Sequence, residues 1–380
     1  MAIRKALDKF PLWLHPSGQW TKKHKGQFHY FGADRDEALK RFVAEWDDRK
    51  AGRQRQPGRN EAATTLAEVV NAFLTAKRER INAGELSEPM WAQYYATCDK
   101  VIDHFGRGRT VSDIRPEEFA KLRAKVAAGV GPVTLLGFVT KARVLFKFAY
   151  DFGLIEHPVR YGNAFDRPSR KTLRLNRAAK RPKLFTAAEV WKLIGIADPQ
   201  LVAMIHLGLN GAMGATDCAQ LTRSMLAHRS GWLDFPRPKT GTMRRFPLWP
   251  ETISALETVR KVRPEPRDEV HADRVFLTRT GQPWVRFAGD QTGKRSVMDA
   301  VAWQFTKLAK RTGVVGSFYT LRHTFRTVAD ELPDQPAITL VMGHVDNSMA
   351  DSYRERIEDG RLKAVVGHVR EWLMDGQPLA

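Results

Sequence analysis

Residues 319–325 read YTLRHTF and residues 340–344 read LVMGH. Arg322 lies in the first string, His344 ends the second, and Tyr353 follows His344 by nine residues. A guanidinium can hold an anion through two parallel hydrogen bonds, and a tyrosine hydroxyl can act as a nucleophile. A lone tyrosine is most often a core or surface aromatic, so only its offset from His344 draws attention to Tyr353.

A hairpin predicted upstream of these strings adds a lysine. Residues 231–249 read GWLDFPRPKTGTMRRFPLW, which predicts strands near 232–236 and 243–248 with Lys239 at the turn. A lysine at a hairpin turn is usually only solvated. Lys239 therefore gains its interest from the chain order, in which a lysine, an arginine, a histidine and a tyrosine follow one another.

This order resembles that of the tyrosine recombinase family, the integrases of phages and mobile elements. In that family an H-x-L-R-H-T string holds a catalytic arginine, an L-G-H string follows, and a nucleophilic tyrosine comes after the histidine. Arg322, His344 and Tyr353 match these three positions at the family's spacing. The layout of the whole chain is also similar, while the specific motifs lie between residues 237 and 353.

The resemblance implies a transesterification at a DNA phosphodiester. Tyr353 would attack phosphorus, form a 3′-phosphotyrosyl bond and free a 5′-hydroxyl, with Arg322 as phosphate clamp. His344 would donate a hydrogen bond to the phosphate, and Lys239 would protonate the leaving oxygen, since a partly desolvated lysine loses its proton readily. Tyr319 replaces the family's first histidine and can still donate a hydrogen bond. No ATP, metal or other cofactor is expected, because the bond energy is retained and protein cations can stabilise the charge.

The sequence departs from the family at one catalytic position. Near the start of its catalytic domain the family has a further arginine, in a string like T-G-x-R-x-x-E-L. Residues 210–221 here read NGAMGATDCAQL, with Asp217 in place of the acid and Gly214 or Met213 in place of the arginine. Loss of an arginine that clamps a phosphate can reduce the rate by ~10³–10⁵.

Three arginines are the nearest replacements in the sequence: Arg223, Arg244 and Arg245. Arg244 and Arg245 lie on the strand after the Lys239 turn, so we expect them to reach the same cleft. The string GAMG at 211–214 allows a second solution, in which backbone N–H groups approach the phosphate. A tight turn between two helices is the favoured interpretation of that string.

The net charge of the chain indicates a polyanionic partner. Its 380 residues include 62 Lys and Arg but 42 Asp and Glu, a formal charge of +20. Such an excess attracts nucleic acid and releases counterions on binding, although it does not distinguish binding from catalysis.

The two cysteines cannot form a disulfide scaffold or a four-cysteine zinc site. No secretory signal or run of ~20 apolar residues is present, so we expect no membrane contact and a cytoplasmic, nucleoid-associated protein of a bacterium.

Composition and periodicity predict three folded parts. The fold class expected is α+β and mainly helical, with a small three-stranded β domain first, a helical domain next, and a mainly helical catalytic domain with a small antiparallel sheet. The boundaries expected are an arm-type β domain at 1–50, a linker at 51–64, a helical core-binding domain at 65–158, a basic linker at 159–183 and a catalytic domain at 184–380.

Apolar spacing and capping residues place the individual elements. Capping boxes at Thr65–Glu68 and Thr186–Glu189 mark two helix starts. In the helical domain, further helices are expected at 90–104, 116–128 and 133–151. In the catalytic domain, we expect a short strand at 275–277 and helices at 296–312, 319–332, 336–342 and 361–374.

Basic side chains in each part are the expected DNA contacts. The N-terminal part carries them on its second strand, where a basic sheet face can lie in a groove. The basic linker and the hairpin carry the others. The residues expected to bind DNA are Lys22, Lys23, Lys25, Arg170, Lys171, Arg174, Arg244 and Arg245.

The leading hypothesis is an integrase that acts on double-stranded DNA at specific attachment sites, as a homotetramer. A catalytically impaired DNA-binding relative that regulates recombination is the alternative, and the missing arginine favours it. A type IB topoisomerase-like nicking enzyme shares the chemistry but acts alone. A transcription factor is the weakest hypothesis, because no helix-turn-helix string is evident. The apolar face of the last predicted helix fits docking on a neighbouring subunit or on its own domain equally well.

Overall fold

The computed structural model describes most of the chain. The described residues are 10–50, 64–227, 231–238, 241–289, 295–345 and 355–377. They form two compact units, with the boundary between Lys180 and Arg181. The first unit contains two separate hydrophobic cores and the second contains one large core. The α+β, mainly helical fold class predicted from the sequence is confirmed.

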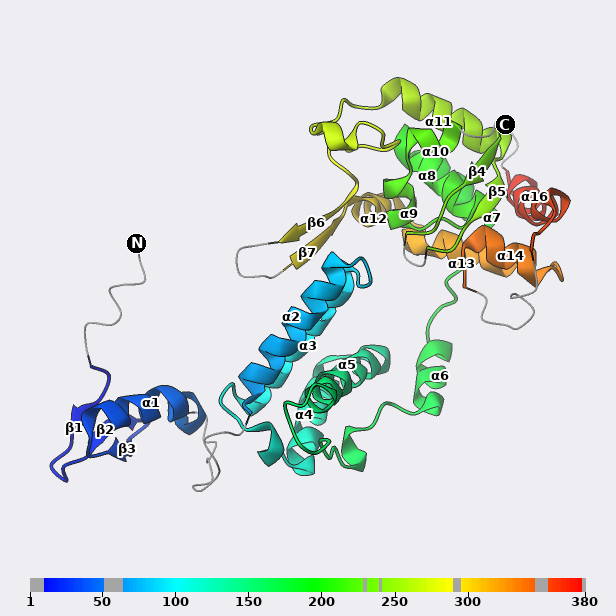
Figure 1. The fold of residues 1–380 in the computed structure, drawn as a ribbon. Coiled ribbons are helices and arrows are strands. Elements are labelled where there is room, and N and C mark those ends of the chain that lie inside the picture. The colour runs from blue at the N-terminus through cyan, green and yellow to red at the C-terminus, as the bar shows by residue number, and fades with distance from the viewer. Residues whose placement is uncertain are drawn as a thin grey trace. The chain divides into compact units, whose positions relative to one another are not determined.

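The N-terminal part is a three-stranded antiparallel sheet covered by a helix (Figure 1). Its elements are β1 (Trp13–Leu14), β2 (Trp20–His24), β3 (Gln27–Gly32) and α1 (Arg35–Lys50). Lys25 and Gly26 form the turn between β2 and β3 with φ of 48° and 84°, the left-handed pair that suits a tight hairpin. Successive side chains point to opposite faces of a strand, so Phe31 packs under α1 whereas Phe28 is exposed on the other face.

Four helices form the second core of this unit. They are α2 (Leu66–Asn82), α3 (Glu88–Phe105), α4 (Pro116–Gly129) and α5 (Pro132–Asp151), with a short turn η2 (Val111–Asp113) between α3 and α4. The capping box predicted at Thr65 and Glu68 is present, since each side chain bonds the backbone N–H of the other residue. Each helix has one apolar face, and Phe73, Phe119 and Leu145 are buried where these faces meet.

The predicted basic linker at 159–183 contains ordered structure. Phe165, in the turn η3 (Asn163–Phe165), is fully buried in the core of the helical bundle. Ser169 then caps a helix, α6 (Arg170–Ala178), by accepting a hydrogen bond from the N–H of Thr172. No residue of α6 is buried, so apolar periodicity could not have revealed this helix.

The second unit is built around helix α8. The unit begins with α7 (Ala187–Ile194), α8 (Pro199–Asn210), α9 (Ala215–Gln220) and α10 (Arg223–Ala227), and ends with α11 (Pro250–Val262), η4 (Glu269–His271), α12 (Ala300–Thr312), α13 (Phe318–Ala329), α14 (Gln335–Met342) and α16 (Asp359–Asp375). Helix α8 is apolar on nearly every side and packs on α11 and α13 (Figure 1). A helix that is apolar all round belongs in the centre of a domain.

Two short hairpins complete the second unit. One pairs β4 (Trp232–Asp234) with β5 (Arg245–Pro247), as the sequence predicts. The other pairs β6 (Val285–Gly289) with β7 (Arg295–Asp299), where the sequence analysis expected the start of a helix at 296. The helix α12 begins only at Ala300, because Asp299 caps it by accepting from the N–H of Ala302. The strand expected at 275–277 is absent: Arg274 forms one isolated bridge and the next three residues are buried loop.

The C-terminal helix α16 packs on its own unit. Five of its side chains are buried there: Leu362, Val365, Val366, Val369 and Leu373. The indole N–H groups of Trp191 and Trp249 donate to the carbonyl oxygens of Leu373 and Val366, at 2.8 and 3.0 Å. Among the described helices, none is long and apolar enough to cross a membrane.

Candidate active site

Arg322 is held inside the second unit by the way α13 packs. Phe318, Leu321 and Phe325 bury one face of the helix, and Arg322 lies close to that face with 2% of its surface exposed. Its Nη1 donates to the carbonyl oxygen of Ala212 at 2.5 Å, and its Nη2 to that of Met342 at 2.9 Å. The guanidinium predicted to clamp phosphate therefore bridges two loops distant in sequence.

The GAMG string forms the first of these loops, a tight turn between α8 and α9. The N–H groups of Gly211 and Met213 both donate to Leu207 O, and that of Gly214 donates to Asp217 Oδ2. These donors are used within the turn, which agrees with the favoured interpretation of the string. Ala212 has a left-handed φ of 50°, which directs its carbonyl to Arg322.

The second carbonyl bonded by Arg322, that of Met342, lies at the C-terminal end of α14. Gly343 terminates the helix with φ of 60°, a conformation that glycine adopts without strain. The backbone N–H of His344 still donates to Thr339 O. This bond fixes the backbone of His344, one residue beyond the cap, and thereby the point from which its imidazole extends. Partial burial and the nearby arginines, Arg322 first among them, lower the pKa of His344 to about 4. At neutral pH this imidazole is uncharged and can both donate and accept.

The β4–β5 hairpin brings Arg244 to the same place. The N–H of Phe235 donates to Arg244 O at 2.8 Å, which extends the ladder beyond the strands. The Arg244 side chain is fully buried, and its Nη2 donates to Asp217 Oδ2 at 2.9 Å and to Met342 O at 3.3 Å. Arg244 and Arg322 thus share the carbonyl of Met342. Burial lowers the pKa of Arg244, while Asp217 opposes that shift.

Arg237 adds a third guanidinium, which the sequence analysis missed. Its backbone pairs with Thr242 across the hairpin, and its Nη1 lies 3.4 Å from Gly343 O. Burial and then the charge of Arg237 are the two largest causes that lower the pKa of Arg322 to about 10. The only signal in the sequence was the position of Arg237 in the hairpin, two residues before Lys239.

The other two proposed replacements lie elsewhere. Arg223 donates to Ala272 O and pairs with Asp273. Arg245 bonds Asp359 at 2.8 Å and lies over the ring of Trp232. The side chain of Arg245 therefore points away from Arg244, as alternation along a strand requires.

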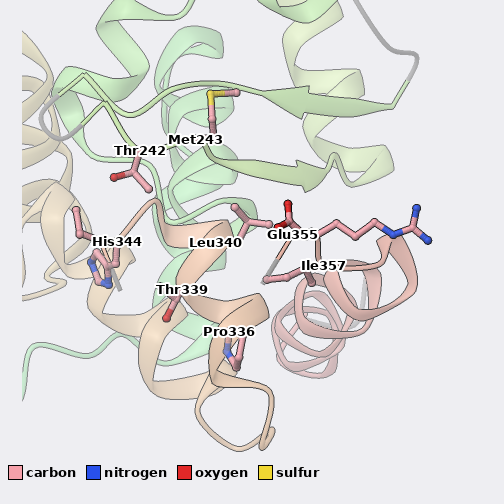
Figure 2. A pocket seen from close by; sticks show the side chains of 10 residues that line it. Thr242, Met243, Pro336, Thr339, Leu340, His344, Glu355 and Ile357 are labelled. Atoms are coloured by element: carbon pink, nitrogen blue, oxygen red, sulfur yellow. The ribbon is translucent and has the colours of Figure 1, made fainter. Parts of the chain in front are cut away.

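A pocket of about 270 Å³ opens beside His344. Figure 2 shows His344 on one side of it, Glu355 and Ile357 on the other, and Thr339 and Leu340 of α14 between them. Tyr353 and Lys239 lie outside the described residues. Val345 and Glu355, the described residues nearest to Tyr353 on either side, both line this pocket.

Tyr319 lies one turn before Arg322 on α13 and is 51% exposed. Its ring lies edge to face with that of His323, and the two ring centroids are 5.2 Å apart. Among the described residues, no group of three or more His, Cys, Asp or Glu side chains is arranged to hold a metal ion.

The lysines of the N-terminal sheet divide between its two faces. Lys22 donates to Pro11 O and lies over Phe42 on the helix-covered face. Lys23 lies over Phe28 on the open face, and Lys25 is exposed at the turn. The single basic face expected from the sequence is therefore divided. In α6, the residues Arg170, Lys171 and Arg174 are all exposed.

No family model matches the sequence, and no curated protein is a significant match to it. Solved structures are similar in fold. A lambda integrase dimer bound to a COC′ core site is 15% identical with a TM-score of 0.54, over 92% of this chain and 95% of that one. A lambda integrase tetramer bound to a Holliday junction is also 15% identical, with a TM-score of 0.55 over 92% and 97%. A Tn1549 transposon integrase with transposon right end DNA is 14% identical, with a TM-score of 0.56 over 81% and 100%. The chain therefore has the tyrosine recombinase fold.

Proposed function

We propose that this protein is a site-specific DNA recombinase of the integrase type, which cleaves and rejoins DNA through a 3′-phosphotyrosyl intermediate. One observation carries the proposal: the guanidinium groups of Arg322, Arg244 and Arg237 converge next to His344 in a chain with the tyrosine recombinase fold. A phosphodiester oxygen gains negative charge as a nucleophile attacks phosphorus, and fixed cations stabilise that charge.

In the proposed reaction the hydroxyl of Tyr353 gives up its proton to solvent as its oxygen attacks phosphorus. The bond from phosphorus to the 5′ oxygen breaks as the 3′-phosphotyrosyl bond forms, and Lys239 protonates the leaving oxygen. His344, uncharged at neutral pH, donates one hydrogen bond to the phosphate through its protonated ring nitrogen. Arg322 holds the non-bridging oxygens, and Tyr319 offers a further hydroxyl one helical turn away. Rejoining reverses these steps.

Double-stranded DNA at specific attachment sites is the proposed partner. The net charge of +20 favours a polyanion, and the solved structures of the same fold contain DNA, one of them as a tetramer on a Holliday junction. We extend that assembly to this chain as a homotetramer on DNA, acting on the nucleoid in the bacterial cytoplasm. The N-terminal sheet would serve as the arm-type domain and the helical bundle as the core-binding domain.

Covalent trapping tests the proposal. The full-length protein is incubated with a pool of randomised duplexes, each nicked so that the cleaved fragment diffuses away, and DNA that stays attached after denaturation is sequenced. We expect an adduct with a recurrent sequence, and its loss in Tyr353→Phe. Tyr150→Phe is the matched control, since it removes the hydroxyl of an exposed tyrosine on α5 to which no role is assigned. Adducts that persist in Tyr353→Phe would exclude Tyr353 as the nucleophile.

The alternative, a DNA-binding relative with impaired catalysis, has one specific observation in its favour. Neither Gly214 nor Met213 supplies the arginine that the family places there. Specific retention of one DNA sequence by the native protein, without an adduct at any protein concentration, would establish this alternative and exclude the recombinase.

A further inference from the structure

The two hairpin arginines beside Arg322 leave buried donors unused. Arg244 has no exposed surface, yet its Nε and Nη1 have no acceptor among the described residues, and the same is true of Nε of Arg237. A buried donor without a partner costs about 1–3 kcal/mol, and more when it is charged. Native proteins rarely leave such groups unsatisfied, so these donors indicate a missing acceptor.

The charge of the cluster indicates that the acceptor is an anion. Arg237, Arg244 and Arg322 bring three guanidinium groups together, and Asp217 is the carboxylate that pairs with one of them. Within the described part of the chain, two positive charges therefore have no carboxylate partner in a largely buried place. A phosphodiester carries one negative charge and gains more during displacement, which suits this excess.

The absence of a side chain at Gly343 leaves room for Arg237 and Arg244 beside Arg322. A Cβ on Gly343 would lie 3.2 Å from both Nε of Arg244 and Cβ of Arg237. Asp217 connects the turn at Gly214 to the arginine, because its Oδ2 accepts both the N–H of Gly214 and Nη2 of Arg244. The guanidinium of Arg244 is thus fixed to the segment where the family's arginine is missing.

We propose that Arg244, assisted by Arg237, replaces the arginine missing at position 213 or 214 and donates hydrogen bonds to the non-bridging oxygens of the phosphodiester held by Arg322. This inference rests on the proposed function for the identity of the phosphate. The anion site itself can be tested without DNA.

Inorganic phosphate is the probe for that test. Calorimetric titration of the full-length protein, at constant ionic strength with chloride as the balancing anion, gives the phosphate affinity. We expect Arg244→Gln to weaken it about tenfold or more, and Arg245→Gln to leave it unchanged. Arg245 is the matched control because it is the neighbouring arginine on the same hairpin and pairs elsewhere. Equal affinities in wild type and Arg244→Gln, or equal losses in both variants, would overturn the inference.

A second set of variants separates this role from support of the fold. Arg244→Gln leaves Asp217 buried without its partner, so Arg244→Gln/Asp217→Asn tests the same loss without a buried unpaired charge. Arg237→Gln, at a half-buried position, should weaken phosphate binding as well.

Adding Gly214→Arg to Arg244→Gln should restore affinity, since a Cβ at 214 meets nothing closer than 3.7 Å. A double variant that binds phosphate as well as wild type before any rescue would disprove the role of Arg244.

The outcome is distinguishable from failure of the proposed function. If Arg244→Gln abolishes phosphate binding but no Tyr353 adduct ever forms, the anion site stands and recombination fails. If adducts form equally fast in wild type and Arg244→Gln, recombination stands and Arg244 has no contact with the reacting phosphate.

Discussion

Arg244 and Arg322 donate from Nη2 to the same carbonyl oxygen, that of Met342, at 3.3 and 2.9 Å. One comes from a hairpin and the other from helix α13, and Asp217 holds the first of them. The fold therefore brings an arginine of the hairpin and an arginine of α13 to the same point in space.

The glycine after α14 should matter for the anion site more than for stability. Gly343→Ala forces a side chain into a left-handed conformation and toward Arg237 and Arg244. We expect a stability loss of about 1 kcal/mol together with weaker phosphate binding. Gly313→Ala is the control, because Gly313 has φ of 71° and a Cβ there would meet nothing within 4 Å. It should lose similar stability in a urea titration but keep phosphate affinity; a parallel loss of affinity would contradict the prediction.

The division of the N-terminal lysines predicts unequal effects on DNA binding. Lys23→Gln removes a charge from the open sheet face, so affinity for random duplex DNA should fall and the salt dependence should decrease by about one phosphate contact. Lys22→Gln should change neither, because its ammonium already donates to Pro11 O on the helix-covered face. Binding isotherms at several salt concentrations measure both quantities. A larger effect from Lys22 than from Lys23 would show that the helix-covered face binds DNA.

Stability should fall with acid through His206. Burial lowers the pKa of this histidine to about 4, with Glu251 opposing the shift. The unfolded chain then takes up a proton between about pH 6.5 and pH 4 that the folded chain does not, so this stabilising term is complete above pH 6.5 and is lost as pH falls to 4. The full effect is roughly 3 kcal/mol.

Urea midpoints measured from pH 7 to pH 4.5 check this expectation. His206→Gln should flatten the decline relative to wild type, and His157→Gln, at an exposed position, should leave it unchanged. A decline of the same steepness in His206→Gln and wild type would assign the acid sensitivity to other groups, such as Glu251.

Helix α16 should contribute strongly to the stability of the second unit. Leu362 is fully buried in the core, so Leu362→Ala should destabilise the unit by about 2–5 kcal/mol through lost burial and a cavity. Leu175→Ala on α6, at a residue that is 61% exposed, should change stability by less than about 0.5 kcal/mol. Thermal unfolding followed by circular dichroism compares the two. Similar midpoints would mean that α16 detaches before the unit unfolds.

The parts of the fold with strong local signals were predictable. The capping box at Thr65 and the apolar face of α5 carry their structure in their own residues. The hairpin of β6 and β7 was missed because β7 joins α12 directly, and the capping residue Asp299 is the last residue of the strand. Helix α6 was missed because it buries nothing.

The candidate site was predictable only in part. The spacing in the sequence singled out Arg322 and His344, and the structure brings both to the Gly343 loop. Arg244 was expected to reach the cleft together with its neighbour Arg245, because side-chain direction along a short strand depends on where the ladder begins. Arg237 was missed because its role depends on tertiary contact with Gly343 O, which no local pattern encodes.

The two indole hydrogen bonds to α16 give the protein a built-in optical reporter. Trp191 and Trp249 each donate to a backbone carbonyl of that helix. If the helix detached from the unit, both rings would lose this bond and become exposed to water. Their emission would then shift to longer wavelength, without any attached dye. Detachment of the C-terminal helix, in free protein or on DNA, should therefore shift the emission of two of the ten tryptophans of the native chain.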